Sequence, residues 1–274
     1  MRRLHPLLRL RSFSQVLRHF KNPFFILLLR LGIVEVPYFL YRIGKDNRRY
    51  SMLARPTSTF MADIFVLREV FIEEAYRDVL PLLNKKNIRL VDIGANIGSF
   101  TIWLNSIIGL REAFCFEPEA DSFRLLIFNL SLNICTTVKA IQSAVGGEER
   151  KIRIALKQDS PGGTSIYGSC KVANVSAQRV PVIAFEKWLH DVAGDFDLLK
   201  MDCEGAEWEI FRKTSTEQFA RFRVFVAEVH DDPEKSQAVS EFKGLAERAG
   251  FQTVRWDNKS QGLYIGVRVG KARL

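Results

Sequence analysis

One stretch in the first half of the chain constrains the fold more than any other. Residues 88–93 are an apolar run that carries Asp92, which is typical of a buried parallel strand. Gly94 and Gly98 follow, and residues 98–109 then have a helical pattern. This order places backbone N–H groups at a helix N-terminus, on the carboxyl edge of a sheet, and so predicts a nucleotide-type pocket. Asp92, Gly94 and Gly98 are the residues that define this predicted turn.

The spacing of the glycines indicates which nucleotide fits. A dinucleotide site has the pattern G-x-G-x-x-G, whereas this turn reads D-x-G-x-x-x-G and lacks the middle glycine. The carboxylate of Asp92 is a poor neighbour for pyrophosphate and a good one for an amino acid's ammonium group. The turn therefore favours S-adenosylmethionine, whose methionine end carries that group. Two alternatives stay open: Asp92 accepts hydrogen bonds from the turn's own amides, or the turn simply needs glycine.

A second acid supports the same cofactor. Residues 113–117 read as another buried strand, which ends in Glu117 and is followed by Pro118. Glu117 lies about 20 residues after the glycine turn, where a ribose-binding carboxylate is expected. A carboxylate there accepts two hydrogen bonds from the ribose diol. The alternative is that Glu117 only caps the helix that starts near Glu119.

Strands and helices alternate from about residue 87 onward. With 274 residues and 47% hydrophobic content, the chain can form one large α/β domain with an appendage. The alternation predicts a mostly parallel sheet with helices on both faces, and the last two strands read as a C-terminal antiparallel hairpin. We expect strands at 88–93, 113–117, 137–145, 151–157, 175–181, 196–202, 222–230, 252–256 and 263–269. We expect helices at 98–109, 119–132, 183–190, 206–213 and 234–249.

The segment before this core has a different composition. Residues 1–55 carry 12 Lys or Arg and two acids, so they account for the basic net charge of +9. The expected elements are helices at 1–20 and 24–31, a hairpin at 37–55 and a helix at 59–83. We therefore predict a basic N-terminal helical and hairpin extension, 1–58, and a second domain, 59–274, with its nucleotide-binding core from about 87.

The basic extension admits three interpretations. Cations interleaved with Leu and Phe allow residues 1–36 to make peripheral contact with an anionic membrane, or to face an acidic partner. Equally, a cationic helix packs on the domain through its apolar stripe. Residues 24–29 are too few to span a bilayer, and no secretory signal is evident. Since the four cysteines lack metal or redox spacing, we expect free thiols and a cytoplasmic protein.

Polar residues cluster where the predicted strands end, which is where such sheets bind ligands. These ends contain residues 143–145, 200–204 and 228–230. Because side chains alternate along a strand, Lys200 shares a side with Asp202. Neighbouring strands would bring together four candidate catalytic residues, namely Asp202, Glu204, Glu228 and His230.

His230 is our candidate for a catalytic base. Methyl transfer requires alignment of the nucleophile and, for a hydroxyl, removal of a proton. An imidazole titrates near neutrality, and a nearby acid would orient it and raise its pKa. Glu207 and Glu209 fall in the first turns of a helix, where acids suit the helix dipole, so Asp202 and Glu204 are better candidates. Two alternatives stay open: a structural His230, or a divalent cation held by the four candidates, although we predict no metal.

Five motifs in order give the chain a resemblance to a known family. They are residues 91–98, residues 116–118 with Asn129 and Asn133, residues 163–165, residues 199–207 and residues 228–230. Over about residues 59–230 the chain resembles the FkbM family of S-adenosylmethionine-dependent methyltransferases. The resemblance implies a Rossmann-like class I methyltransferase with a seven-stranded sheet, and makes 59–274 an FkbM-type domain.

The resemblance also implies roles for individual residues. Ser143 and Ala144 would lie near the adenine, and the pairs Asp202/Glu204 and Glu228/His230 would face the acceptor. Cys203 stands where the family often has an aliphatic residue. The cofactor residues that we predict are Asp92, Gly94, Ala95, Asn96, Gly98, Phe100, Glu117, Pro118, Ser143, Ala144 and Asp202.

We therefore predict an S-adenosylmethionine-dependent O-methyltransferase that acts on a hydroxyl of a saccharide or a secondary metabolite. One alternative is an NAD(P)-dependent oxidoreductase of similar fold, against which the missing middle glycine argues. Another is a non-catalytic module that only binds S-adenosylmethionine. No signature of an RNA-binding fold is present, so we expect no nucleic-acid partner.

Overall fold

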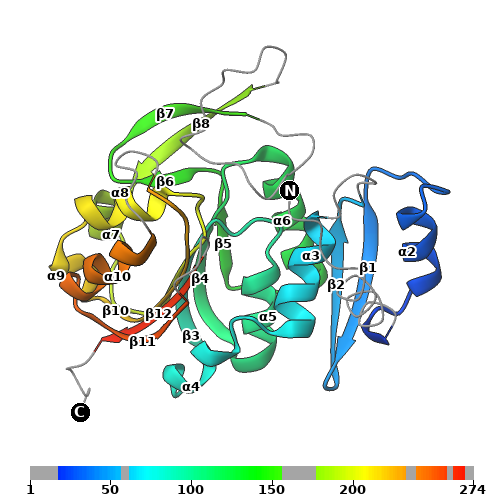
Figure 1. Ribbon diagram of the computed structural model, residues 1–274, viewed down its shortest axis with the longest axis horizontal. Helices are drawn as coiled ribbons and strands as arrows, with labels where there is room; N and C mark the ends of the chain where they lie inside the picture. The colour runs from blue at the N-terminus through cyan, green and yellow to red at the C-terminus, as the bar shows by residue number, and fades with distance from the viewer. Residues whose placement is uncertain (1–17, 57–61, 156–176, 233–238, 258–261, 269–274) are drawn as a thin grey trace.

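The computed structural model describes residues 18–56, 62–155, 177–232, 239–257 and 262–268 (Figure 1). Its central sheet consists of β3 (Ile88–Ile93), β4 (Leu110–Phe116), β5 (Val138–Ile141), β9 (Phe196–Met201), β10 (Phe222–Val229), β11 (Phe251–Trp256) and β12 (Gly262–Arg268). The strands lie in the order β11-β12-β10-β9-β3-β4-β5. β12 pairs antiparallel with β10 and β11, and the other neighbours pair parallel. The predicted seven-stranded, mostly parallel Rossmann-like sheet with an antiparallel C-terminal pair is confirmed.

Side-chain alternation divides the two faces of this sheet between two cores. Leu90 and Leu198 point into a core that includes α5 (Ser99–Ile108) and α6 (Ala120–Leu132). Val91 and Leu199 point the other way, into a core with α7 (Phe185–Asp191), α8 (Ala206–Lys213), α9 (Thr216–Phe219) and α10 (Val239–Arg248). Figure 1 shows these two groups of helices on opposite sides of the sheet. The prediction of helices on both faces is therefore confirmed.

The strand order reverses beside β3. From β3 the chain moves outward to β4 and β5, and it later places β9 on the other side of β3. Sheets of this kind bind ligands in the crevice at the reversal, outside the carboxyl ends of the strands. The turn after β3 and the ends of β4 and β9 border that crevice.

The strand expected at 137–145 is wrong, because the chain forms two strands there. β5 belongs to the large sheet, whereas β6 (Ala144–Gly146) pairs with β8 (Ala177–Ala184), which also pairs with β7 (Arg150–Ala155). The break falls at Ser143, whose N–H donates to the carbonyl of Ile141 at 3.0 Å. Its Oγ lies 2.7 Å from the carbonyl oxygen of Ala144 and 2.9 Å from that of Pro181. These contacts turn the chain out of the large sheet.

The helix expected at 59–83 is also wrong as one continuous element. α3 (Ala62–Arg68) runs into a π-helical turn, η1 (Glu69–Glu73), and Glu74 then takes a left-handed φ of 51°. A 3₁₀ turn, η2 (Arg77–Val79), and α4 (Leu80–Leu83) follow. Glu74 forms ion pairs with Lys45, Arg48 and Arg77. Because two of these partners lie on the N-terminal hairpin, sequence periodicity could not predict the break.

The expected hairpin is present and packs on the core domain. It consists of β1 (Phe39–Lys45) and β2 (Arg48–Ala54), and α2 (Pro23–Arg30) precedes it. Asn129 on α6 accepts from the N–H of Leu53 at 2.7 Å and donates to its carbonyl at 3.0 Å. Asn133, one turn later, makes the same pair of bonds with Ser51 at 3.2 and 2.8 Å. Two helix side chains thus satisfy the backbone of an edge strand.

Some expectations fall outside the described residues. These are most of the helix at 1–20, residues 156–176 with the 163–165 motif and Cys170, and the start of the helix at 234–249. Cys115 and Cys135 are buried free thiols, and Cys203 is a half-buried one. Within the described ranges, no helix has the length and apolar character needed to cross a membrane.

Candidate active site

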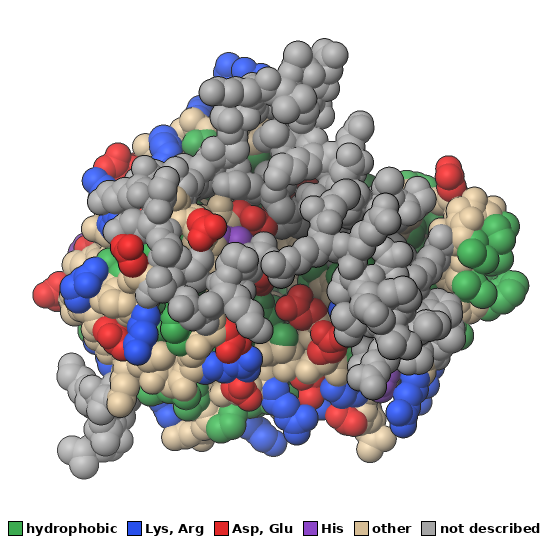
Figure 2. Space-filling model, in the orientation of Figure 1, with side chains coloured by type: hydrophobic (Ala, Val, Ile, Leu, Met, Phe, Trp, Pro, Cys, Tyr) green, Lys and Arg blue, Asp and Glu red, His purple; other side chains and the backbone are tan. Residues whose placement is uncertain are grey.

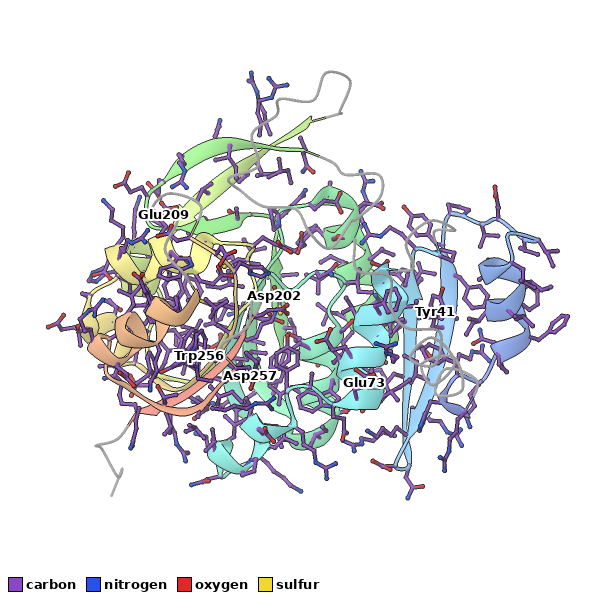
Figure 3. The ribbon with its side chains drawn as sticks, viewed as in Figure 1. Tyr41, Glu73, Asp202, Glu209, Trp256 and Asp257 are labelled. Atoms are coloured by element: carbon purple, nitrogen blue, oxygen red, sulfur yellow. The ribbon has the colours of Figure 1, made fainter. Side chains whose placement is uncertain are left out.

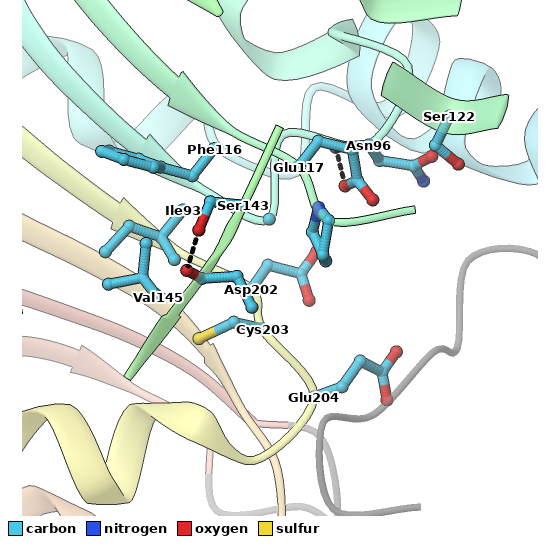
Figure 4. A pocket seen from close by; sticks show the side chains of 13 residues that line it. Ile93, Asn96, Phe116, Glu117, Ser122, Ser143, Val145, Asp202, Cys203 and Glu204 are labelled. Atoms are coloured by element: carbon cyan, nitrogen blue, oxygen red, sulfur yellow. Dashed lines mark hydrogen bonds between the residues drawn. The ribbon is translucent and has the colours of Figure 1, made fainter. Parts of the chain in front are cut away.

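A pocket opens at the reversal of strand order, between the carboxyl ends of β3, β4 and β9 (Figure 4). The empty space between its lining residues, which is open to solvent, is about 570 Å³. The predicted cofactor residues that line it are Gly94, Asn96, Glu117, Pro118, Ser143, Ala144 and Asp202. The other lining residues are Ile93, Phe116, Ser122, Val145, Cys203 and Glu204. The pocket thus has acidic residues at two strand ends and an apolar wall between them.

The turn after β3 requires glycine at its first position. Gly94 has a φ of 78°, and a Cβ there would lie 1.8 Å from the carbonyl oxygen of Asp202. Any side chain would therefore push the turn away from the end of β9. Asn96 has a φ of 51°, and its Oδ1 is buried without a hydrogen-bond partner among the described residues. The turn therefore holds an acceptor that the N–H or O–H of a ligand can satisfy.

Backbone amides hold Glu117 at the β4 side of the pocket. Its carboxylate accepts from the N–H of Glu119 at 2.8 Å and from the N–H of Asn96 at 2.9 Å, and Figure 4 shows the second bond. Burial raises the pKa of Glu117 to about 7, although these two N–H groups act in the opposite direction. The N-cap of α6 is Glu119, which accepts from Asp121 and Ser122. Glu117 therefore does not cap that helix, and its carboxyl group borders the pocket in a fixed orientation.

Asp92 does not line the pocket, although sequence reasoning made it a cofactor ligand. It is fully buried, accepts a hydrogen bond from Thr101 Oγ1 at 2.7 Å and lies 3.1 Å from Lys200 Nζ. Its partners are therefore a threonine and a lysine, not the amides of the turn. Three further predicted residues, Ala95, Gly98 and Phe100, also form the turn and the start of α5 without lining the pocket.

Lys200 connects the two acids at the ends of β3 and β9. It is buried, its Nζ donates to the carbonyl of Gly94 at 2.8 Å, and it lies 3.8 Å from Asp202. Burial lowers the pKa of Lys200, but Asp92 and Asp202 raise it by more, so the net pKa lies above the ordinary lysine value. Lys200 therefore stays charged and holds the glycine turn against β9.

His230, which follows β10, lies between two carboxylates. Its Nδ1 is 3.4 Å from Glu207 and its Nε2 is 3.8 Å from Glu204. Burial lowers the pKa of His230, but Glu207, Asp202 and Glu204 raise it to about 10. The imidazole is therefore protonated at neutral pH and can accept a proton only after it has lost its own.

Glu207 is a residue of the site that sequence reasoning set aside. It is fully buried, and it accepts from the N–H groups of Cys203 and Gly205 at 2.7 and 2.8 Å. Burial raises the pKa of Glu207, but His230 and the N–H of Cys203 contribute to lowering it by more. The signal was its position in the first turn of α8, directly after the acids Asp202 and Glu204 at the end of β9. Glu207 was set aside because an acid in the first turn of a helix is already explained by the helix dipole.

A second cavity lies beside the end of β10 and is lined mainly by acids. Its walls contain Glu69, Glu73, Glu74, Ala75, Tyr76, Asp78, Glu228, Arg255, Asp257 and Leu263. Figure 3 shows Asp202 near the centre of the molecule with Glu73 and Asp257 below it, and Figure 2 shows acidic side chains gathered on this face. Arg255 pairs with Asp78 and Asp257, and Arg68 pairs with Glu73. Within the described residues, Glu69 and Glu228 have no cation at ion-pair distance.

Glu228 and Tyr76 are the buried polar groups of this acidic cavity. Burial raises the pKa of Glu228 to about 8, and the charges of Asp202 and Glu69 add to the effect. Tyr76 is also buried. Burial, Asp202 and Glu228 raise the pKa of Tyr76 well above its ordinary value, so its hydroxyl keeps its proton. The cavity therefore offers both a hydrogen-bond donor and carboxyl acceptors.

The four candidate catalytic residues do come together at the ends of β9 and β10. Asp202 influences the pKa values of both Glu228 and His230, and Glu204 lies beside His230. In the described ranges, no group of three His, Cys, Asp or Glu side chains has an arrangement that could hold a metal ion. At these strand ends, three acids lie around one imidazolium.

Two proteins and one solved structure show what the chain resembles. Methyltransferase 1 of Beauveria bassiana (strain ARSEF 2860) is 27% identical over 218 residues, which are 72% of this chain and 86% of that protein. Methyltransferase sdnD of Sordaria araneosa is 25% identical over 221 residues, which are 70% and 83% of the two chains. The crystal structure of methyltransferase FkbM from Methylobacillus flagellatus KT is 14% identical, with a TM-score of 0.45, and the match covers 65% of this chain and 43% of that chain.

The family profile described as "Methyltransferase FkbM domain" matches residues 92–253, which is more than half of the chain. The match begins at Asp92 and extends through the glycine turn, Glu117 and the cluster around His230. The chain therefore belongs to the FkbM family of methyltransferases.

Proposed function

We propose that this protein is an S-adenosylmethionine-dependent O-methyltransferase whose acceptor is a hydroxyl of a saccharide or a secondary metabolite. The observation that carries the proposal is the adjacency of two different sites at the ends of β9 and β10. One is the pocket between Asn96, Glu117 and Asp202, and the other is the acidic cavity with Glu228 and Tyr76. Membership of the family supports methyl transfer, and the acidic cavity supports a hydroxylated acceptor.

The pocket residues fit a nucleoside cofactor that carries hydrogen-bond donors. Asn96 Oδ1 has no partner among the described residues, and the carboxyl group of Glu117 is oriented by two N–H groups, so both can accept from ribose hydroxyls or an ammonium group. Ile93, Phe116 and Val145 form an apolar wall suited to a purine ring. When bound, S-adenosylmethionine supplies a methyl group on a sulfonium, which is already a strong electrophile.

The proton of the acceptor hydroxyl goes most readily to Glu228. His230 is held as a cation up to a pH of about 10, whereas Glu228 becomes a carboxylate near pH 8. A base is most effective when its pKa lies near the working pH. Glu228 therefore takes the role that the sequence gave to His230. His230 instead balances the charges of Glu204 and Glu207 and fixes the end of β10.

Calorimetric titration with S-adenosylmethionine tests the cofactor half of the proposal. Glu117→Gln should weaken binding by about 10- to 100-fold, because a charged hydrogen bond contributes about 1.5–3 kcal/mol. Glu112→Gln, on β4 but outside the pocket, is the matched control and should bind normally. Absence of binding to the wild type, or equal binding by both variants, would contradict the proposal.

The pH dependence of kcat/KM tests the base. An acceptor is first found by mass-spectrometric detection of a methyl gain on hydroxylated saccharides and metabolites. Activity should then rise with pH through about 8, and Glu228→Gln should lower it by about 10²–10⁴-fold and remove that rise. If His230→Gln removes the rise and Glu228→Gln keeps it, the base is His230. Cofactor binding without transfer to any acceptor would favour the non-catalytic module.

A further inference from the structure

Helix α2 is apolar on the side that packs on the protein and on the side that does not. Ile26 belongs to the core that contains the hairpin side chains Tyr41 and Met52, and Ile26 and Leu29 are only 1% and 4% exposed. On the outer side Phe24 and Leu31 are 68% and 61% exposed. A helix that is apolar all round is normally buried on all sides. The outer side of α2 is therefore expected to be covered by a binding partner or a membrane.

Two further apolar side chains extend this exposed outer side of α2. Phe25 is 51% exposed and stacks on Phe39, and Ile33, just past the helix, is 65% exposed. We call Phe24, Phe25, Leu31 and Ile33 the α2 surface. Figure 2 shows it as a hydrophobic patch at the right edge of the molecule, where Figure 1 places α2. Single exposed apolar residues are common on proteins, but a contiguous group of four large ones indicates an interaction site.

Cations accompany the α2 surface. Arg18 and Lys21, just before the helix, are exposed, and the sequence up to Lys21 also contains Arg2, Arg3, Arg9 and Arg11 without any acid. Residues 1–55 hold 12 of the Lys and Arg residues and only two acids. A surface of large apolar side chains flanked by cations has the two features that attract a protein to anionic lipid headgroups.

We propose that the α2 surface docks on an anionic membrane, with Phe24, Phe25, Leu31 and Ile33 entering the headgroup region and the flanking cations contacting lipid phosphates. Charge argues for this occupant over a second copy of the chain. In a symmetric dimer through α2, two strongly basic segments would face each other and repel. α2 has eight residues, so it lies on the surface of a membrane and does not span it.

Flotation of the full chain with liposomes tests the proposal. The wild type should float with vesicles of phosphatidylcholine and phosphatidylserine, and not with phosphatidylcholine alone. Phe24→Ser with Leu31→Ser should weaken binding about tenfold or more for each residue. Arg18→Glu with Lys21→Glu should weaken it about fivefold for each lost cation, and added salt should mimic this effect.

Val254→Glu is the matched control, since Val254 is 50% exposed on β11, which lies far from α2 in Figure 1. It should float like the wild type. All the altered side chains are exposed, so circular dichroism and S-adenosylmethionine titration should be unchanged in each variant. Failure of the wild type to float, or equal flotation of the Phe24/Leu31 variant, would overturn the proposal. Light scattering that showed a dimer abolished by the same two substitutions would also overturn it and make α2 a homodimer interface.

Discussion

The two halves of the active site hold their acids by different means. On the β4 side, Glu117 and Glu119 are held mainly by backbone N–H groups, and Glu119 also pairs with Arg55 at 3.3 Å. On the β9 and β10 side, Asp92 and Glu207 are neutralised by the cationic side chains of Lys200 and His230, which come from distant parts of the chain. The first arrangement rests mainly on hydrogen bonds from the backbone, whereas the second includes buried ion pairs between side chains. Substitutions can test that difference.

The largest effect is expected at Lys200. Lys200→Met leaves Asp92 buried without its cation, and removal of one partner of a buried pair costs about 3–5 kcal/mol. Urea denaturation should show this loss in the free energy of unfolding. Adding Asp92→Asn to Lys200→Met should restore much of it. A single variant as stable as the wild type would mean that the β9 side does not depend on its cation.

A smaller effect is expected on the β4 side. Glu119→Ala removes the N-cap of α6, which costs about 0.5–2 kcal/mol, and Arg55, which loses one partner, keeps its ion pair with Asp63. The same denaturation experiment measures it, with Ser131→Ala at an exposed position of α6 as the control. A loss as large as that of Lys200→Met would remove the distinction between the two halves.

The smallest effect is expected in how steeply the free energy of unfolding changes with pH. The folded pKa of His230, about 10, lies above its ordinary value of 6.5, so its contribution to stability is complete below pH 6.5 and is lost as the pH rises towards 10. Between pH 7 and 8 the loss is at most about 1.4 kcal/mol. His230→Gln should flatten this part of the stability curve, whereas His190→Gln, on the exposed end of α7, should not. An unchanged slope would mean that Glu207 does not hold His230 as a cation.

The same distinction explains what the sequence could and could not predict. The strand, glycine turn and helix around Gly94 depend on neighbouring residues, so the sheet and the pocket position were predictable. The partners of Asp92 were not, because Lys200 reaches it only through the pairing of β3 with β9. Tyr76 was expected inside a continuous helix, and it joins the acidic cavity only because the chain breaks at Glu74. The ion pairs of Glu74 with Lys45 and Arg48, on the distant hairpin, stabilise that break.

The paired asparagines of α6 have a practical consequence for anyone who shortens this protein. A cut near residue 58 looks harmless on the sequence, because the family match begins later. Such a cut would remove the strand that binds Asn129 and Asn133, and would bare the apolar surface now covered by Tyr41 and Met52. The N-terminal region is therefore a structural part of the enzyme, and shortened versions should be designed to retain it from β1 onward.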